Sequence, residues 1–148
     1  DAWREFAGYL ITTKNYDEKD LLLITPCTSP LRNVETLIGI IKKLNKNPEA
    51  DGIICIKKSN VLPDFNLLKK NKDNFLNIYI NGKRKINRQN SSPAWEMTTI
   101  AYCYKLGSII ENKDLFELNT IGYDVKFPES LDIDTHEDLD LARKLINQ

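Results

Sequence analysis

Two apolar runs of strand length lie on either side of a helical pattern in the first part of the chain. The runs "DLLLIT" (20–25) and "GIICIKK" (52–58) are continuous rather than alternating, which is typical of strands covered on both faces. Between them, apolar residues recur at helical spacing and predict a helix over about 33–46, with Asn33 as its cap. A strand–helix–strand unit usually belongs to a parallel sheet. The pattern therefore predicts an α/β fold with a mostly parallel sheet.

The remaining segments extend this pattern over residues 1–148 as a single domain. Helices are expected at 2–13 (with Asp1 as a possible cap), 105–112 and 136–147, and strands at 96–105 and 119–127. Residues 59–93 differ, because they are rich in Asn, Lys and Pro and contain one strand-like run, "FLNIYI", followed by the turn signal Asn81-Gly82. We interpret 59–93 as an excursion from the sheet that contains a hairpin.

Composition excludes several classes of partner. The 148 residues include 21 basic and 21 acidic ones, so the chain has no general field that would attract nucleic acid or an anionic membrane. Its longest apolar runs are far too short to span a bilayer, and its first ten residues do not have the pattern of a signal peptide. The widely spaced Cys27, Cys55 and Cys103 are expected to be reduced core thiols, as in a cytoplasmic protein.

The loop "TPCTSPLR" (25–32) follows a buried strand and precedes a helix. In open α/β sheets, ligands bind in the crevice beyond the carboxyl ends of the strands. Thr28 and Ser29 offer hydroxyl groups there, and Arg32 offers a planar fork for phosphate or carboxylate. The amino end of the following helix also favours an anion. An ordinary capped connection between strand and helix explains the same residues.

The densest basic cluster of the chain lies in "NGKRKINRQ" (81–89). It consists of Lys83, Arg84, Lys85 and Arg88. Such a cluster is suited to binding an anion, and a solvated hairpin tip explains it equally well.

Asp132 and Asp134 flank Ile133 in "DIDTHEDLDLARKL" (132–145). In extended backbone, residues two apart point the same way, so both carboxylates could face one cation while Ile133 faces the core. Magnesium prefers such ligands, with phosphate oxygens and waters completing its shell. The alternative is a helix start, because Thr135 and Asp138 have capping-box spacing. The two interpretations are compatible.

Three of these stretches, taken in order, resemble one family. "TPCTSPLR", "RQNSSPAWEMTTIAY" and "ESLDIDTHEDLDLARKL" are similar to ordered motifs of the acylneuraminate cytidylyltransferases, also called CMP-sialic acid synthetases, across residues 20–147. The resemblance implies a three-layer, Rossmann-like nucleotidyltransferase fold. It also implies an enzyme that transfers CMP from CTP to an acidic sugar, such as a sialic acid, with release of pyrophosphate. The expected cofactor is Mg²⁺, and the expected assembly is a homodimer in which 59–93 reaches the partner.

The resemblance also implies roles for single residues. Asp132 and Asp134 match the magnesium ligands, and Arg88 matches an arginine near the acidic sugar. Gln89 and Glu96 belong to the same substrate-binding motif. The loop bearing Thr28, Ser29 and Arg32 is expected to border the substrate cleft.

Two departures from the family pattern change what we expect of the chain's length and of its acceptor. The family begins with a glycine- and lysine-bearing nucleotide loop that this chain lacks, so we expect a carboxyl-terminal portion without the first strands. The chain alone could then be inactive, and a non-catalytic fragment that keeps the fold and the dimer surface is the alternative. Glu96 stands where sialic-acid members often carry arginine, which favours a different acceptor, and 3-deoxy-manno-octulosonate is one candidate.

Overall fold

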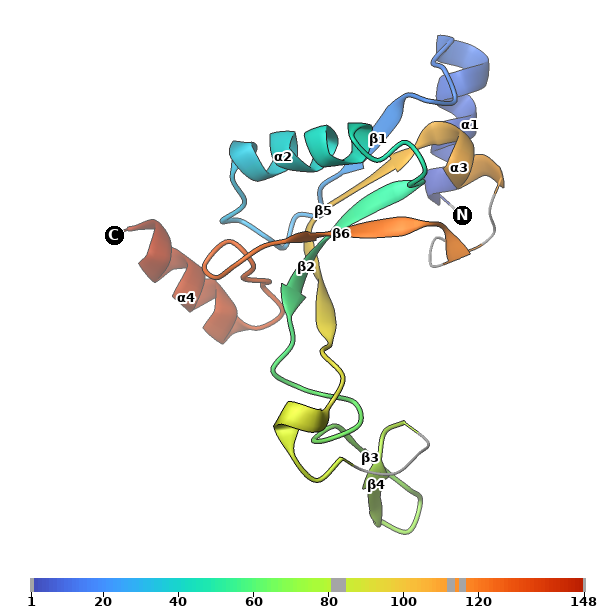
Figure 1. Ribbon diagram of the computed structural model, residues 1–148. Coiled ribbons are helices and arrows are strands. Elements are labelled where there is room, and N and C mark those ends of the chain that lie inside the picture. Colours follow the sequence, from blue (N-terminus) through green and yellow to red (C-terminus); the bar gives the residue numbers. More distant parts are fainter. Residues whose placement is uncertain (1, 81–84, 112–113, 115–116, 148) are drawn as a thin grey trace. The chain divides into compact units, whose positions relative to one another are not determined.

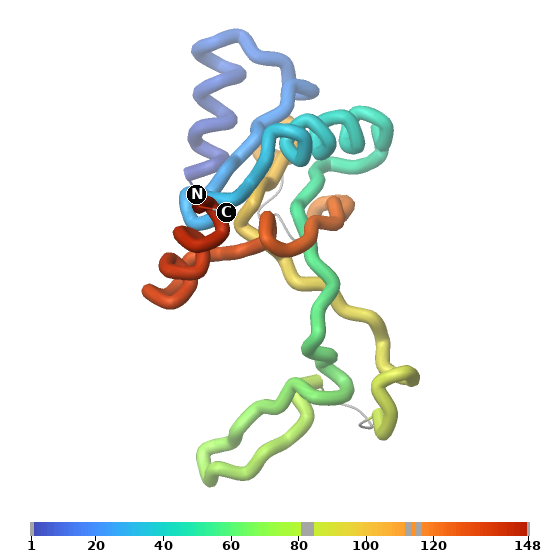
Figure 2. The backbone as a smooth tube through the Cα atoms, turned by 90° about the vertical axis from the view of Figure 1, so that its left-hand side faces the viewer, coloured from blue at the N-terminus to red at the C-terminus, as the bar shows by residue number. Residues whose placement is uncertain are grey.

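The computed structural model of the chain describes residues 2–80, 85–111, 114 and 117–147. They form two compact units, one built from residues 1–56 and 97–148 and the other from Lys57–Glu96. The chain leaves the first unit along strand β2 (Gly52–Lys58) and returns to it along strand β5 (Trp95–Lys105) (Figure 1, Figure 2). The second unit contains residues 59–93, the segment that we interpret as an excursion.

A mixed four-stranded sheet forms the centre of the first unit. Its order among the described residues is β1 (Leu21–Ile24), β5, β2 and β6 (Thr120–Asp124). β5 is antiparallel to β1, and β2 is parallel to β6. β5 is also antiparallel to β2, because the Lys105 backbone nitrogen donates to the Asp51 carbonyl while the Thr98 hydroxyl donates to the Cys55 carbonyl. The predicted strand–helix–strand unit is therefore parallel, with β5 lying between its two strands.

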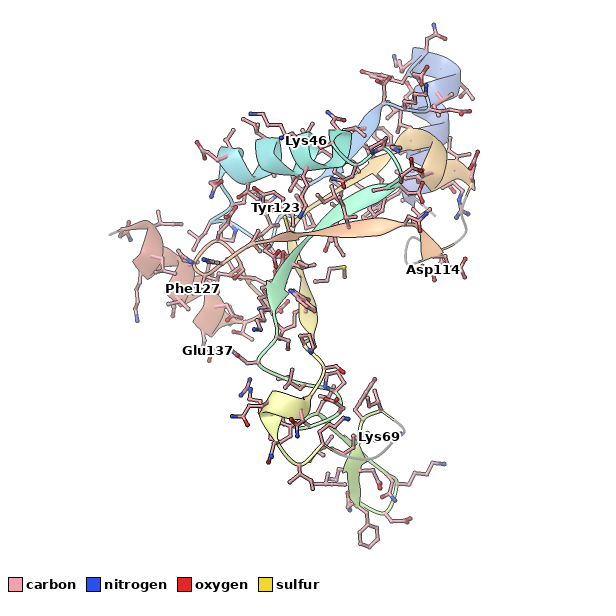
Figure 3. The ribbon with its side chains drawn as sticks, viewed as in Figure 1. Lys46, Lys69, Asp114, Tyr123, Phe127 and Glu137 are labelled. Carbon is pink, nitrogen blue, oxygen red and sulfur yellow. The ribbon has the colours of Figure 1, made fainter. Side chains whose placement is uncertain are left out.

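Helix α2 (Val34–Asn45) covers one face of this sheet. The buried core on that face combines residues of α2, β2 and β5 with two residues just outside the strands: Ile40, Leu44, Ala50, Ile53, Cys55, Ile100, Ala101, Cys103 and Val125. Partly buried residues of α2, β1 and β6 pack against it: Leu21, Leu23, Leu37, Ile41, Ile121 and Tyr123. Tyr123 of β6, which is labelled in Figure 3, lies against Gly39, where a larger side chain would clash with the tyrosine ring. The Lys43 ammonium lies 5.8 Å from the centre of the same ring.

Helices α1 (Ala2–Lys14) and α3 (Leu106–Glu111) cover the opposite face. Their core includes Ala7, Tyr104, Leu106, Ile109 and Leu118, with Trp3, Leu10, Ile11, Leu22, Ile54 and Tyr102 packed against it. Leu21 and Leu23 thus face one helix layer and Leu22 the other, as the pleat of a strand requires. The α/β fold that the apolar runs predict and the three layers that the family resemblance implies are both confirmed, because helices lie on both faces of the sheet.

The second unit contains a short hairpin of β3 (Leu68–Lys70) and β4 (Leu76–Ile78), paired antiparallel. The turn lies at 71–75, where the Asn71 side chain accepts from the backbone nitrogens of Asp73 and Phe75 and Asn74 has a φ of 68°. The strand-like run "FLNIYI" thus contains β4, the second strand of this hairpin. Asn81-Gly82 lies outside the described residues, as do Asp1, Lys83 and Arg84.

Two further sequence expectations can be compared with the described residues. Cys55 and Cys103 are buried and free, as expected, but Cys27 is free and exposed, because it lies in the loop after β1 rather than in the strand itself. The expectation that all three thiols belong to the core was wrong for Cys27. No helix in the described part of the chain is both long enough and apolar enough to cross a membrane.

Candidate active site

The loop after β1 is held in shape by its own polar side chains. Ser29 is buried, and its hydroxyl lies 2.7 Å from the hydroxyl of Thr99 on β5. Arg32 folds back over the loop, with Nε donating to the Ser29 carbonyl at 2.9 Å and Nη2 donating to the Pro26 carbonyl. Two of the groups that the sequence offered to a substrate therefore already hold the loop. Thr28 is half-buried, and its carbonyl oxygen accepts a hydrogen bond from the backbone nitrogen of Ile133.

Residues 132–134 lie beside this loop. The Ile133 backbone nitrogen donates to the Thr28 carbonyl oxygen at 2.9 Å. Residues 25–32 follow β1 and residues 125–134 follow β6, so the contact joins two segments that leave the sheet at the carboxyl ends of strands running in the same direction. Two of the three motifs picked out in the sequence thus meet at the end of the sheet where α/β proteins bind ligands.

Asp132 and Asp134 differ in exposure at this place. Asp132 is half-buried, and its Oδ1 is a buried oxygen without a hydrogen-bond partner among the described residues. Asp134 is exposed. The residues that the structure describes contain no group of three or more His, Cys, Asp or Glu side chains able to hold a metal ion. Two carboxylates, one with an unsatisfied oxygen, fit a magnesium ion that takes its other ligands from phosphate and water.

The same segment also starts helix α4 (His136–Ile146), as the alternative interpretation predicted. Thr135 and Asp138 form a capping box, in which the Thr135 hydroxyl accepts from the Asp138 backbone nitrogen and the Asp138 carboxylate accepts from the Thr135 backbone nitrogen. Asp138 Oδ2 also accepts from the Asp134 backbone nitrogen at 3.3 Å. The hydroxyl and backbone donors of Thr135 lower the pKa of Asp138. Helix capping uses Asp138 and leaves the carboxylates of Asp132 and Asp134 outside the cap.

Sequence reasoning missed Glu129. Its carboxylate lies at the amino end of α2, accepting from the Asn33 backbone nitrogen at 3.2 Å and from the Thr36 hydroxyl at 3.0 Å. Asn33 caps the helix as predicted, accepting from the Thr36 backbone nitrogen at 2.7 Å. The anion-favouring end of α2 therefore already holds a carboxylate of this chain. The local sequence does not predict this contact, because Glu129 is far in sequence from Asn33 and Thr36.

Arg88 and Gln89 belong to the second unit, in a short 3₁₀ helix (Arg88–Asn90). Both line a pocket of about 570 Å³, together with Lys58, Ser59, Asn60, Leu62, Ser91 and Pro93. Arg88 Nη2 donates to the Asn60 carbonyl at 2.9 Å, which orients the guanidinium at the pocket wall. Two cationic side chains and several hydroxyl and amide groups make this pocket suitable for a polar anion.

Glu96 is connected to that pocket through Ser59. Its Oε1 accepts from the Ser59 hydroxyl at 2.6 Å, and its Oε2 lies 3.3 Å from the Lys57 ammonium. The Ser59 hydrogen bond and the Lys57 charge lower the pKa of Glu96. Among the described residues the ionic partner of Glu96 is Lys57.

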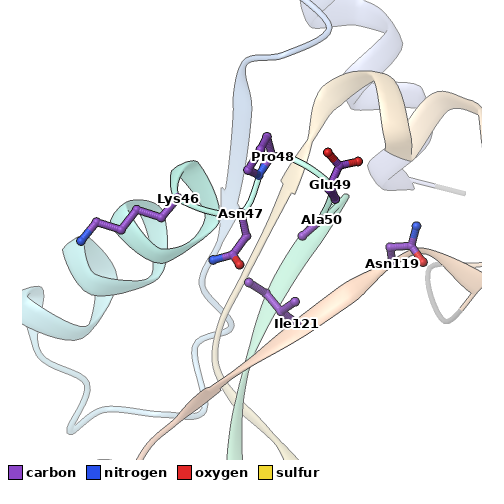
Figure 4. A pocket seen from close by; sticks show the side chains of 7 residues that line it. All are labelled: Lys46, Asn47, Pro48, Glu49, Ala50, Asn119 and Ile121. Atoms are coloured by element: carbon purple, nitrogen blue, oxygen red, sulfur yellow. The ribbon is translucent and has the colours of Figure 1, made fainter.

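A separate pocket of about 480 Å³ lies at the amino ends of β2 and β6 (Figure 4). Its lining residues are Lys46, Asn47, Pro48, Glu49, Ala50, Asn119 and Ile121. The segment with Asp132 and Asp134 follows the opposite, carboxyl end of β6. None of the residues that the sequence predicted for the site lines this pocket.

Comparison with known proteins gives matches in structure and not in sequence. No protein-family model matches the chain, and no curated protein matches it. A structure of 4-diphosphocytidyl-2C-methyl-D-erythritol synthase matches 97% of this chain with a TM-score of 0.64 and 16% identity, over 64% of its own length. The 2-C-methyl-D-erythritol 4-phosphate cytidylyltransferase of Francisella tularensis matches 96% with a TM-score of 0.63 and 13% identity, over 66% of its length.

A third similar structure is that of CMP:2-keto-3-deoxy-manno-octonic acid synthetase in complex with CTP. It matches 96% of the chain with a TM-score of 0.56 and 11% identity, over 68% of its own length. The chain thus spans about two thirds of the structures it resembles. The likeness confirms the predicted nucleotidyltransferase-like α/β fold, which is the fold of these cytidylyltransferases.

Proposed function

We propose that this chain belongs to a cytidylyltransferase that transfers CMP from CTP to an acidic sugar. The observation that carries the proposal is the hydrogen bond from Ile133 to Thr28, because it places the aspartate pair beside the loop after β1. The proposal is supported by the fold, which is shared with a diphosphocytidyl-methylerythritol synthase, a cytidylyltransferase and a CMP-sugar-acid synthetase in complex with CTP. It is also supported by the ordered motifs of the sequence, which resemble those of CMP-sialic acid synthetases.

In this proposal Asp132 and Asp134 hold Mg²⁺, and Thr28, Ser29 and Arg32 border the nucleotide. The unsatisfied Oδ1 of Asp132 supports the assignment. Bound magnesium would neutralise charge on the phosphates of CTP. The role of Arg32 and Ser29 follows from their contacts: they keep the loop rigid, so that the carbonyl of Thr28 holds residues 132–134 in place.

The proposed reaction is an attack by an acceptor oxygen on the α-phosphorus of CTP. A new oxygen–phosphorus bond forms, the bond between the α-phosphorus and the bridging oxygen breaks, and pyrophosphate leaves with that oxygen. For a sugar acid the attacking group is the anomeric hydroxyl, which gives up its proton to solvent or to the leaving pyrophosphate. The Mg²⁺ that Asp132 and Asp134 would hold would stabilise the negative charge that develops on the phosphoryl oxygens.

We assign the acceptor's anionic group to the pocket of Arg88 and Gln89. An arginine fork pairs with a carboxylate through two parallel hydrogen bonds, and Lys58 adds a second positive charge to the pocket lining. Glu96 lies next to this pocket through Ser59 and carries negative charge, which disfavours a second anionic group on the acceptor close to it. This arrangement supports an acceptor with a single anionic group, bound at Arg88 and Lys58 and away from Glu96.

The similar structures favour two other acceptors as specific alternatives. One is the sugar acid 3-deoxy-manno-octulosonate, which the name of one matched synthetase contains. The other is an alditol phosphate, by the name of the Francisella tularensis enzyme. With an alditol phosphate the attacking oxygen would belong to a phosphate, and the product would contain a diphosphate bridge. The mass of the product separates these cases.

We also propose that the active protein is a homodimer that uses the second unit as contact surface. Its hairpin exposes several large apolar side chains, with exposed fractions of 70% for Phe75, 63% for Leu76 and 56% for Tyr79. A shallow pocket of about 410 Å³ beside them is lined by Phe65, Asn66, Leu68, Leu76 and Ile78. Apolar groups gathered on a small unit favour burial against another protein surface.

The test is a transfer assay on the protein as it is encoded, including any residues on either side of this chain. CTP and Mg²⁺ are incubated with N-acetylneuraminate, 3-deoxy-manno-octulosonate or methylerythritol phosphate, and pyrophosphate release and product mass are measured. We expect a cytidylylated product from one acceptor, and about a hundredfold slower formation of it by the Asp132→Asn variant. Failure to form product with any acceptor, together with no binding of CTP in calorimetry, would rule out the proposed function.

A further inference from the structure

Glu129 bridges helix α2 and the segment that carries Asp132. Its Oε1 accepts from the backbone nitrogen of Asn33 at 3.2 Å, and its Oε2 accepts from the hydroxyl of Thr36 at 3.0 Å. Thr36 is buried, and Glu129 is half-buried. Because both oxygens of the carboxylate are engaged by one helix end, the side chain has a single orientation and holds its own backbone against α2.

The electrostatics of the helix end favour this contact. The amino end of a helix carries partial positive charge and unsatisfied backbone donors, and a carboxylate there is stabilised. Asn33 accepts from the Thr36 backbone nitrogen at 2.7 Å, so its side chain and Glu129 act on the same first turn. The contact joins the start of α2 to the segment after β6, which are remote in sequence.

Asp132 lies between two such contacts. Glu129 precedes it by three residues and binds the start of α2, and Ile133 follows it and binds Thr28 in the loop before α2. The intervening turn is closed by hydrogen bonds from Ser130 to the Lys126 carbonyl at 3.0 Å and from Leu131 to the Pro128 carbonyl at 3.1 Å. The backbone of Asp132 therefore cannot move away from residues 25–36 unless one of these contacts breaks.

We infer that Glu129 is a positioning residue for the cation site of Asp132 and Asp134. It does not touch the cation, but it fixes the distance between the aspartates and the loop after β1. The affinity of the site for a divalent cation therefore depends on Glu129 and on the Thr36 hydroxyl that orients it. The inference rests on the proposed function. Outer-shell residues of metal sites typically change metal affinity by about 10–100-fold when removed.

The experiment measures Mn²⁺ binding by electron paramagnetic resonance in the presence of CTP, for the full protein at a temperature where circular dichroism shows every variant folded. Glu129→Ala is expected to raise the dissociation constant of Mn²⁺ about tenfold or more. Thr36→Val keeps the shape of the side chain and removes its hydroxyl, and it is expected to weaken binding by a smaller factor. Thr36→Ser restores the hydroxyl and should bind like the wild type.

Asp140→Asn serves as the matched control. It removes one carboxylate from α4, where Asp140 pairs with Arg143 at the surface, and it should leave Mn²⁺ affinity unchanged. A second readout is the exchange rate of the Ile133 amide hydrogen, which should increase in Glu129→Ala and Thr36→Val and not in Thr36→Ser. This rate reports on the Thr28 contact without any metal present.

The outcomes separate the inference from the proposed function. If the wild type does not bind Mn²⁺ in the presence of CTP, the proposed function fails, and the inference fails with it. If the wild type binds Mn²⁺ while Glu129→Ala and Thr36→Val bind it equally tightly, only the inference is overturned. Equal loss of affinity in Thr36→Val and Thr36→Ser would also overturn it, because the effect would then not depend on the hydroxyl that Glu129 accepts from.

Discussion

The backbone nitrogen of Ile133 donates a hydrogen bond to the carbonyl oxygen of Thr28 at 2.9 Å. This contact brings together the loop after β1 and the aspartate pair after β6, which are separated by most of the chain. Both partners are backbone atoms, so only a substitution of Ile133 by proline would remove the bond directly, and proline would also restrict the backbone at that position. The predictions that concern this site therefore use the side chains around it.

Replacing either aspartate by asparagine should reduce CMP transfer strongly while the fold is kept. Loss of charge next to a phosphoryl centre is expected to lower kcat by on the order of a hundredfold. Asp134→Asn should leave thermal stability unchanged, because Asp134 is exposed and its carboxylate is not part of the α4 cap. The measurements are kcat for each variant and thermal melting by circular dichroism. Wild-type turnover in both variants would leave helix capping as the only role of this segment.

Thiol labelling should modify one cysteine much faster than the other two. Cys27 is exposed, whereas burial raises the pKa of Cys55 to about 12 and that of Cys103 to about 11. The thiolate is the reactive form, so at pH 8 the two buried thiols should react only when the protein unfolds. A chromogenic disulfide reagent counts the fast thiol, and Cys27→Ser should abolish the fast phase.

The same labelling tests the loop as a binding element. If residues 25–32 border bound nucleotide, CTP with Mg²⁺ should slow the reaction of Cys27, and CTP should not protect it in the Asp132→Asn variant at the same concentration. An equal labelling rate with and without CTP would show that the loop does not contact the nucleotide.

Glu96 provides a prediction on pH. The Ser59 hydrogen bond, followed by the Lys57 charge, lowers the pKa of Glu96 below its ordinary value. Because the pKa of Glu96 is lower in the folded than in the unfolded protein, Glu96 stabilises the fold fully at pH values above its unfolded-state pKa. This stabilisation is lost as the pH falls through the folded-state pKa. Ser59→Ala should therefore raise the pKa of Glu96, measured by NMR titration of its carboxyl carbon. Lys57→Met should raise it less, and an unchanged pKa in Ser59→Ala would contradict the assigned cause.

Self-association should depend on the hairpin of the second unit. Phe75→Ser and Tyr79→Ser remove exposed apolar surface without disturbing a buried core, so they should weaken dimerisation and leave the melting temperature of the dissociated protein unchanged. Light scattering over a range of concentrations gives the molecular mass. Phe6→Ser on α1 is a suitable control, because Phe6 is 50% exposed in the first unit. A wild-type protein that stays monomeric at high concentration would contradict the prediction.

The secondary structure could be predicted from the sequence because apolar periodicity follows directly from burial. β2 coincides with the run "GIICIKK", and α2 begins one residue after the predicted Asn33 cap. The position of the β3–β4 turn could not be derived from the sequence, because two segments carry turn residues: "NKDN" at 71–74 is as good a signal as Asn81-Gly82, and local propensity does not decide between them. The structure uses Asn71 as the side-chain acceptor of the turn.

The candidate site could be predicted only in part. Asp132, Asp134 and the loop after β1 stand out as polar residues placed after apolar runs, and parallel strands bring such segments to one edge of a sheet. Glu129 could not be found in this way, because a carboxylate at a helix start remote in sequence depends on the packing of α2 against β6. Cys27 was misjudged for a related reason: the apolar run ends before it, and the thiol follows the loop into solvent.

Arg88 should control the binding of the acceptor more than that of CTP. Its guanidinium is held at the pocket wall by the Asn60 carbonyl at 2.9 Å, with the pocket lined by Lys58 and Gln89 as well. An arginine paired with a carboxylate makes two parallel hydrogen bonds that lysine cannot reproduce. Arg88→Ala and Arg88→Lys should therefore both raise the acceptor KM by about tenfold or more while the CTP KM changes little. Arg143→Ala removes an exposed arginine from α4 and serves as the charge control.

Glu96→Arg tests whether the negative charge beside this pocket selects the acceptor. The substitution reverses the charge next to Ser59 and Lys57, so it should improve kcat/KM for N-acetylneuraminate relative to the natural acceptor. Glu96→Gln keeps the hydrogen bond with Ser59 and removes the charge, and it should give an intermediate ratio. The decisive measurement is kcat/KM for two acceptors on the wild type and both variants. Efficient use of N-acetylneuraminate by the wild type, with the same ratio in all three proteins, would show that Glu96 does not determine acceptor specificity.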